Sequence, residues 1–238
     1  MSSSPSASPT FIQKALAWMV HSFTASGLVA GFMAMLAINQ QDWRGAMLWL
    51  LAALLIDGLD GSLARRFRVK EVLPYMDGKT MDYIIDFATY AIIPAYFFYM
   101  AELTTPPWNL ICTIVILIVS ALYYGKEGMV SNDMYFVGFP VMWNMVVFYL
   151  IFVFQTGPVW NTILIFIFAI LHFVPIKFAY PSQAVRFRKL ILLITVLFFV
   201  ALIGILWGYP ESSIWLRALA IGTALGYGIL AVYNTWME

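Results

Sequence analysis

The sequence predicts an all-α polytopic membrane protein with about eight transmembrane helices. Of its 238 residues, 63% are hydrophobic and only 11% are charged, and the mean hydropathy is +0.86. A soluble domain carries about 25% charged residues, far more than this chain has. Eight mostly apolar segments each approach the roughly 20 residues that a helix needs to cross a bilayer. They lie near residues 22–40, 44–63, 80–101, 108–125, 137–155, 159–177, 189–208 and 213–236.

The charge balance argues against a nucleic-acid-binding protein, and the distribution of Lys and Arg orients the predicted spans. The net charge is +1 and no long basic run exists, so we expect no nucleic-acid partner. With eight spans, one side of the membrane receives every Lys and Arg except Arg44 and Arg217. Because basic loops remain in the cytoplasm, both termini are predicted to be cytoplasmic.

The N-terminal segment is expected to hold a tail and an interfacial helix. Residues 1–10 are rich in Ser and Pro, which bury little apolar surface, so a disordered tail is predicted. Phe11, Ala15, Trp18 and Met19 then recur at helical spacing. This pattern is typical of an amphipathic helix on the membrane surface, placed before the first span. Residues 11–238 are expected to form a single transmembrane domain.

Four aspartates lie where the second and third predicted spans approach their shared connection. Asp57 and Asp60 are three residues apart, and Asp82 and Asp86 are four apart. In a helix, each spacing puts both side chains on one face. The connection is short, which favours antiparallel neighbouring helices. We therefore expect the four carboxylates to meet near the cytoplasmic boundary, where acidic residues within spans usually mark function.

Four clustered carboxylates repel one another at reduced dielectric, so they must be protonated or held together by cations. Oxygen ligands favour Mg²⁺, Mn²⁺ or Ca²⁺ over zinc or copper, and a pair of such cations suits phosphoryl transfer. Two alternatives are an ion-paired helical hairpin, neutralised by neighbouring basic residues, and a cation transporter. The transporter reading is weakened by the position of the acids at one boundary and by the lack of an internal repeat.

Small and basic residues accompany the acids on the same helical faces. Gly61 and Ala64 follow Asp57 by four and seven positions, and Gly78 precedes Asp82 by four. These residues leave room for a ligand beside the carboxylates, and Arg65 could meet a phosphate oxygen.

Together these residues resemble the signature of the CDP-alcohol phosphotransferases. The chain reads Asp57-Gly-Leu-Asp60-Gly61-x2-Ala64-Arg65, then twelve residues, then Gly78-x3-Asp82-x3-Asp86. The gap between the two halves is longer than in the common form. This gap, the added Gly58, the eight expected spans and the phrase His21–Gly27 are similar to a bacterial branch that uses choline as the acceptor.

The resemblance implies phosphatidyl transfer from CDP-diacylglycerol to choline with release of CMP, at the cytoplasmic face of the bacterial inner membrane. It also implies a possible homodimer and two divalent cations, Mn²⁺ or Mg²⁺. It assigns Asp57, Asp60 and Asp82 to the metals. Asp86 would join that site and act as general base. It assigns Gly61, Ala64, Arg65 and Gly78 to the CDP pocket. The same chemistry with serine, inositol or glycerol phosphate as the acceptor remains an alternative.

The remaining candidates concern the choline and lipid contacts. A quaternary ammonium group is recognised by aromatic faces and a carboxylate. The choline candidates are Tyr83, Tyr90, Tyr124, Asp133, Tyr135, Trp143 and Asn144. Interfacial aromatic belts also account for many such residues. Lys177, Arg186 and Arg188, between the sixth and seventh spans, are candidates for binding the lipid phosphates, or else serve only to set topology.

Overall fold

The computed structural model describes residues 8–131, 134–179 and 187–236. The first half consists of α1 (Phe11–Asn39), α2 (Trp43–Arg66), α3 (Val69–Val72), α4 (Gly78–Phe87), the π-helical turn η1 (Ala88–Ile92), α5 (Ile93–Met100) and α6 (Trp108–Tyr124). The second half consists of β1 (Tyr135–Val137), α7 (Trp143–Phe148), the π-helical turn η2 (Tyr149–Phe154), α8 (Pro158–Leu171), β2 (Lys177–Ala179), α9 (Arg188–Gly208) and α10 (Ile214–Trp236).

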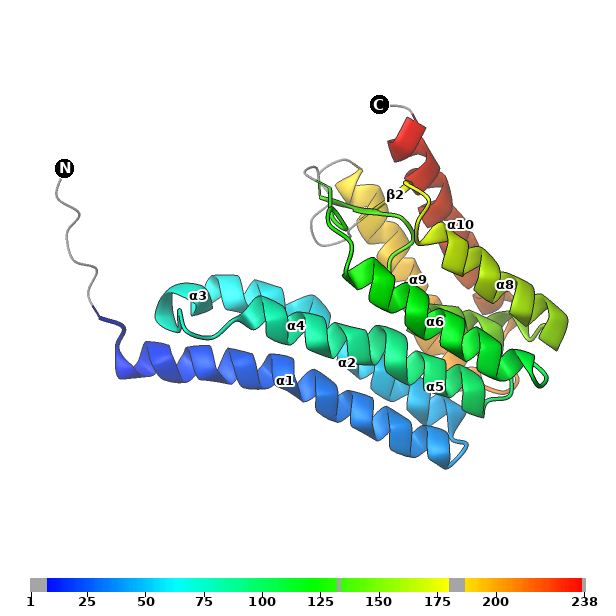
Figure 1. Cartoon of the computed structure of the whole chain (residues 1–238), viewed down its shortest axis with the longest axis horizontal. Coiled ribbons are helices and arrows are strands. Elements are labelled where there is room, and N and C mark those ends of the chain that lie inside the picture. Colours follow the sequence, from blue (N-terminus) through cyan, green and yellow to red (C-terminus); the bar gives the residue numbers. More distant parts are fainter. Residues whose placement is uncertain (1–7, 132–133, 180–186, 237–238) are drawn as a thin grey trace.

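The helices form two groups with a buried segment between them. In Figure 1, α1, α2 and the continuous run α4–η1–α5 lie side by side, and α8, α9 and α10 lie on the other side of the molecule. Every residue of α7 is buried. This helix contacts α2, η1 and α5, while η2 contacts α9 and α10. The apolar core therefore extends through α7 and η2 from one group to the other.

Five helices in the described residues are long and apolar enough to cross a membrane. They are 11–39, 43–66, 78–100, 188–208 and 214–236. Helices also occupy the other three predicted positions, but 108–124, 143–154 and 158–171 are shorter. The expected segments 137–155 and 159–177 include Pro140 and Pro175, and proline interrupts a helix. The structure supports a helical membrane protein, and the count of eight spans remains a prediction.

The first helix is longer than the predicted span. α1 runs without a break from Phe11 to Asn39, so the segment expected to form a separate interfacial helix is continuous with the first span. Thr10 caps it: the Thr10 hydroxyl accepts from the Gln13 backbone N–H, and the Gln13 side chain accepts from the Thr10 N–H. This capping box fixes the start of the helix where the sequence placed it. Residues 1–7 of the expected tail lie outside the described residues.

Beside the helices of the expected all-α fold, the described residues contain one short strand pair. β1 and β2 are antiparallel, with Phe136 opposite Phe178. β1 adjoins the start of the expected span 137–155, and β2 adjoins the end of the expected span 159–177. Pro140 and Pro175 lie near these boundaries and interrupt the helices there. The backbone groups there find partners between the two strands instead, since buried N–H and C=O groups must be paired.

Two glycines on α1 allow the third predicted span to approach closely. A Cβ atom on Gly27 would lie 3.0 Å from Ile85 Cγ2, and one on Gly31 would lie 2.7 Å from Ile93 Cδ1. Small residues permit this kind of close helix contact in membrane proteins. Since Ile85 directly precedes Asp86, the contact at Gly27 also fixes the position of that carboxylate.

A small apolar cluster and a helix cap position the connection between α2 and α4. Val69, Val72 and Leu73 are buried against Ala17 and Val20 of α1. At the start of α4, the Asp77 carboxylate accepts hydrogen bonds from the Thr80 side chain and from two backbone N–H groups. The hydrogen bonds from Thr80 hold the pKa of Asp77 below its ordinary value. A charged N-cap stabilises the first turn of α4, which carries the second half of the acidic motif.

We expect Gly27→Leu to destabilise the protein and lower its activity. The new side chain would force α4 away from α1 and shift Asp86, and overpacking of this kind costs about 1–3 kcal/mol. The matched control is Gly228→Leu on α10, where an added Cβ meets nothing within 4 Å. The check is the thermal unfolding midpoint in detergent together with turnover. Equal stability of the two variants would contradict the role given to the α1–α4 contact.

Candidate active site

Three of the four predicted aspartates come together in the structure. One carboxylate oxygen from each of Asp57, Asp82 and Asp86 lies within 4.8 Å of the others. Asp57 comes from α2, and the other two from α4. Because α4 is a regular helix from Gly78 to Phe87, Asp82 and Asp86 project from one face toward α2. The sequence prediction that the two acidic faces meet is thus borne out in space for these three residues.

The aspartates form no salt bridge with a basic side chain in the described residues, although Arg65 is near enough to Asp60 to interact with it electrostatically. The one salt bridge found in this part of the chain joins Arg68 to Glu71. One oxygen of Asp86, Oδ1, is buried and has no hydrogen-bond partner among these residues. The alternative of an ion-paired hairpin therefore lacks its ion pairs. Convergent oxygen donors and an orphaned carboxylate oxygen fit a hard divalent cation.

Asp60 lies beside this group rather than within it. Its side chain is only 7% exposed. The Asp60 carboxylate interacts with the Thr24 side chain of α1 and the Gly61 backbone N–H, and it lies near Asp57 and Asp82. Thr24 was not predicted from the sequence, since a lone Thr on an apolar helix gives no signal of its partner.

Tyr90 contacts the carboxylate cluster directly through its hydroxyl group. Its hydroxyl donates to Asp57 Oδ2 at 2.7 Å, and the ring is buried. Tyr90 lies in η1, the π-helical turn that follows α4. A π turn changes the direction of the side chains that follow it, and such turns occur often at functional sites. The sequence placed Tyr90 among the choline candidates, and its geometry gives it a role in orienting Asp57.

Three aromatic rings lie next to the acidic cluster. The Tyr124 ring of α6 makes edge contacts with Tyr83 at 6.0 Å and with Phe87 at 5.6 Å between centroids. Tyr124 is close enough to Asp57, Asp82 and Asp86 to interact electrostatically with all three. Tyr83 and Tyr124 were choline candidates. Phe87 was not, although it directly follows Asp86 in the sequence.

The residues expected to form the CDP pocket lie where α2 ends and α4 begins. The Arg65 guanidinium lies over Gly61, since a Cβ there would be 3.4 Å from Arg65 Nη1, and it donates to Ser62. On α4, a Cβ on Gly78 would lie 3.2 Å from His21 Cε1 of α1. Ala64 packs against the small apolar cluster that α1 forms with α3 and Leu73. The absence of side chains at the two glycines makes room for the Arg65 guanidinium over Gly61 and for the His21 imidazole over Gly78.

The weaker candidates fall into different surroundings. Trp143 is fully buried, stacks on His172 at 5.2 Å and donates from Nε1 to Ser120. Asn144 is 1% exposed, and its Oδ1 accepts from the next backbone N–H. These two side chains contribute to the core between the helix groups.

The remaining candidates belong to the strand-pair end of the molecule or lie beyond the described residues. The Lys177 ammonium lies 5.9 Å from the centre of the Tyr135 ring, on neighbouring strands. Arg188 is exposed at the start of α9. Asp133 and Arg186 lie outside the described residues.

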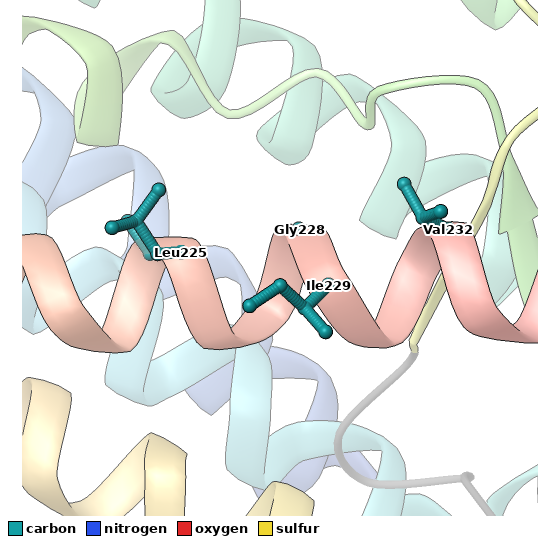
Figure 2. Close-up of a pocket in the computed structure, with 5 residues that line it drawn as sticks. Leu225, Gly228, Ile229 and Val232 are labelled. Atoms are coloured by element: carbon teal, nitrogen blue, oxygen red, sulfur yellow. The ribbon is translucent and has the colours of Figure 1, made fainter.

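A shallow groove on α10 carries none of this chemistry. Figure 2 shows Leu225, Gly228, Ile229 and Val232 along its length, and Ala224 completes the lining. The lining is apolar and contains no titratable group. An apolar surface of this kind on a membrane helix suits lipid chains.

The geometry and the motif agree with a known class of proteins. A model of the CDP-alcohol phosphatidyltransferase family matches residues 16–230, and the chain belongs to this family. Among curated proteins it is similar to bacterial enzymes named phosphatidylcholine synthase. It is 39% identical to the one from Rhizobium meliloti over 209 residues, which cover 88% of this chain and 86% of the relative. The relatives from Pseudomonas aeruginosa (39% over 194 residues, 82% and 81%) and Legionella pneumophila (36% over 235 residues, 95% and 91%) are comparable.

We expect Tyr90→Phe to weaken metal binding and to lower activity about 10- to 100-fold, the usual effect of losing a group that orients a metal ligand. The measurement is CMP release as a function of Mn²⁺ or Mg²⁺ concentration. The matched control is Tyr96→Phe, which removes a similar hydrogen bond from the Tyr96 hydroxyl to Asn39 Oδ1, also 2.7 Å long, on the same helical run. An unchanged metal requirement in Tyr90→Phe would show that the bond to Asp57 does not tune the site.

Proposed function

We propose that this protein transfers the phosphatidyl group of CDP-diacylglycerol to choline and releases CMP. The observation that carries the proposal is the convergence of Asp57, Asp82 and Asp86, at the family's motif spacing, in one unpaired carboxylate cluster. The similar proteins that bear the name phosphatidylcholine synthase support choline as the acceptor.

Asp57, Asp82 and Asp86 would hold a divalent cation, with Asp60 beside them for a second. Such cations, Mg²⁺ or Mn²⁺, neutralise the charge of the diphosphate and stabilise the departing CMP. Four acids around one diphosphate would otherwise repel the substrate. The role of the chain is to hold these carboxylates in place, which Tyr90 does for Asp57 through its hydrogen bond. Thr24 lies close enough to Asp60 to interact with it.

Asp86 is the residue we assign as general base. The choline oxygen attacks the phosphorus that carries the diacylglycerol, the bond from that phosphorus to the CMP oxygen breaks, and the hydroxyl proton passes to Asp86. A free alcohol is a weak nucleophile, so a carboxylate within hydrogen-bond reach accelerates the attack. The Asp86 carboxylate has two oxygens, so one can accept this proton while the other faces a cation.

The aromatic group next to Asp86 is the best candidate for holding choline. A quaternary ammonium donates no hydrogen bond and is held by ring faces and negative charge. Tyr83, Phe87 and Tyr124 lie together beside the carboxylates. They would place the choline hydroxyl near Asp86. Trp143 is unsuitable for contacting choline because its ring is enclosed by the core.

The placement of the protein in the cell follows from the distribution of its basic residues. We propose that the protein lies in the bacterial cytoplasmic membrane with both termini and the aspartate cluster on the cytoplasmic side, because the basic residues concentrate there. Five of these basic residues lie in the connection between α2 and α4 or on the adjoining helix ends: Arg65, Arg66, Arg68, Lys70 and Lys79. A homodimer remains a prediction from the family.

Purified protein in mixed micelles is expected to release CMP from CDP-diacylglycerol when choline and Mn²⁺ or Mg²⁺ are present, and to stop in EDTA. Parallel reactions contain serine, inositol or glycerol 3-phosphate instead of choline. Release with one of those alcohols alone would retain the chemistry and overturn choline as the acceptor. Metal-dependent cation flux in liposomes without CMP formation would favour a transporter.

The two aspartates of α4 should differ in kinetics. We expect Asp82→Asn to lower both activity and metal affinity, because it removes a ligand. Asp86→Asn should cost turnover more than CDP-lipid binding, since the base acts only in the transition state. The measurement compares kcat, KM for CDP-diacylglycerol and the metal concentration for half-activity. Near-native turnover of Asp86→Asn would exclude it as the base.

A further inference from the structure

His21 of α1 is a buried polar side chain that the motif does not include. Its residue is 6% exposed, and its Nε2 atom is buried with no hydrogen-bond partner in the described part of the chain. A buried donor or acceptor without a partner costs about 1–3 kcal/mol, so each one needs an explanation, and a bound ligand is one of them.

The surroundings of His21 place it at the start of α4. Its Cε1 atom would lie only 3.2 Å from a Cβ on Gly78, so the imidazole lies directly over this glycine. The Trp18 ring contacts the imidazole edge-on, with 6.3 Å between the ring centroids. Gly78 belongs to the motif half that carries Asp82 and Asp86. The lack of a side chain at Gly78 therefore makes room for the imidazole. The unpartnered Nε2 belongs to this same imidazole and is bonded to the Cε1 atom that lies over Gly78.

The position of His21 relative to the carboxylates indicates which part of the substrate it meets. His21 precedes Thr24 by three residues, about 4.5 Å along the helix, and Thr24 interacts with Asp60. Gly78 likewise precedes Asp82 by one helical turn. His21 and Gly78 therefore lie on the side of the aspartates that faces the charged connection between α2 and α4, away from the apolar interior. The diacylglycerol chains of a CDP-lipid must extend into the membrane, so its nucleoside extends in the opposite direction, past the carboxylates that handle the diphosphate.

We propose that His21 is a substrate-binding residue that hydrogen-bonds the nucleoside of the CDP-lipid, so that α1 forms a third wall of the nucleotide pocket beside α2 and α4. The inference rests on the proposed function and adds a residue that determines how the nucleotide is held. The ribose hydroxyls and the polar edge of the base are the groups available to Nε2.

His172 shows what a structural histidine looks like in the same protein. Its Nε2 is also buried without a partner in the described residues, but its Nδ1 bonds to the Phe168 carbonyl oxygen at 2.7 Å. Aromatic rings from Trp143, Tyr123 and Phe139 surround it. His172 is therefore enclosed by the core, whereas His21 lies over a glycine of the substrate motif.

The test compares His21→Leu, His21→Gln and the control Ser22→Ala, an exposed neighbour on α1. Kinetics give KM for CDP-diacylglycerol and for choline, and inhibition gives Ki for CMP and for inorganic pyrophosphate. We expect His21→Leu to raise KM for CDP-diacylglycerol and Ki for CMP about five- to ten-fold, the loss of one hydrogen bond. KM for choline and Ki for pyrophosphate should not change. His21→Gln, whose amide nitrogen approaches the position of Nε2, should recover part of the loss.

Two results would overturn the proposal. A folded His21→Leu protein with unchanged KM for CDP-diacylglycerol would make His21 structural, and an equal rise in Ki for pyrophosphate would make it a phosphate contact. If His21→Leu unfolds more easily, the CMP-induced rise in its thermal midpoint decides: a smaller rise than in wild type and Ser22→Ala supports the proposal, and an equal rise overturns it. CMP binding needs no acceptor alcohol, so this outcome is independent of whether choline is the acceptor.

Discussion

The mutual repulsion of three carboxylates is the constraint on which the rest of the structure depends. Asp57, Asp82 and Asp86 are held within 4.8 Å of one another without a basic partner in the described residues. Like charges at this separation and reduced dielectric repel strongly, so protons or a cation must compensate them while the packing holds the carboxylates together. The chemistry proposed for the protein uses this same place.

The packing that resists the repulsion comes from outside the acidic motif. Gly27 and Gly31 let α1 lie against the run α4–η1–α5, and the buried cluster around Val69 and Leu73 holds the connection between the two motif halves. Tyr90 then fixes one oxygen of Asp57. The first helix therefore also helps to build the site: the face of α1 that carries Gly27 and Gly31 places Thr24 next to Asp60 and His21 over Gly78.

Where the sequence analysis failed, the reason was non-local packing. Hydropathy located all eight apolar segments and placed 108–125 almost where the structure has its helix. It could not show that the helix of the fifth segment begins only at Trp143, after Pro140, or that β1 pairs with β2. Trp143 and Tyr124 looked equivalent as aromatic residues near helix ends. One is enclosed by the core and the other lies beside the carboxylates, and this difference depends on which helices pack together.

The sequence by itself determined the membrane class, the start of α1, the acidic faces of α2 and α4, and the family, because each rests on composition or on spacing within a single helix or motif. Tertiary structure alone decided that Asp60 lies beside the cluster, that Tyr90 orients Asp57, and that His21 lies over Gly78. Each of these contacts joins residues from different helices, at distances set by close packing and by the π turn η1. No periodicity within one helix specifies such distances.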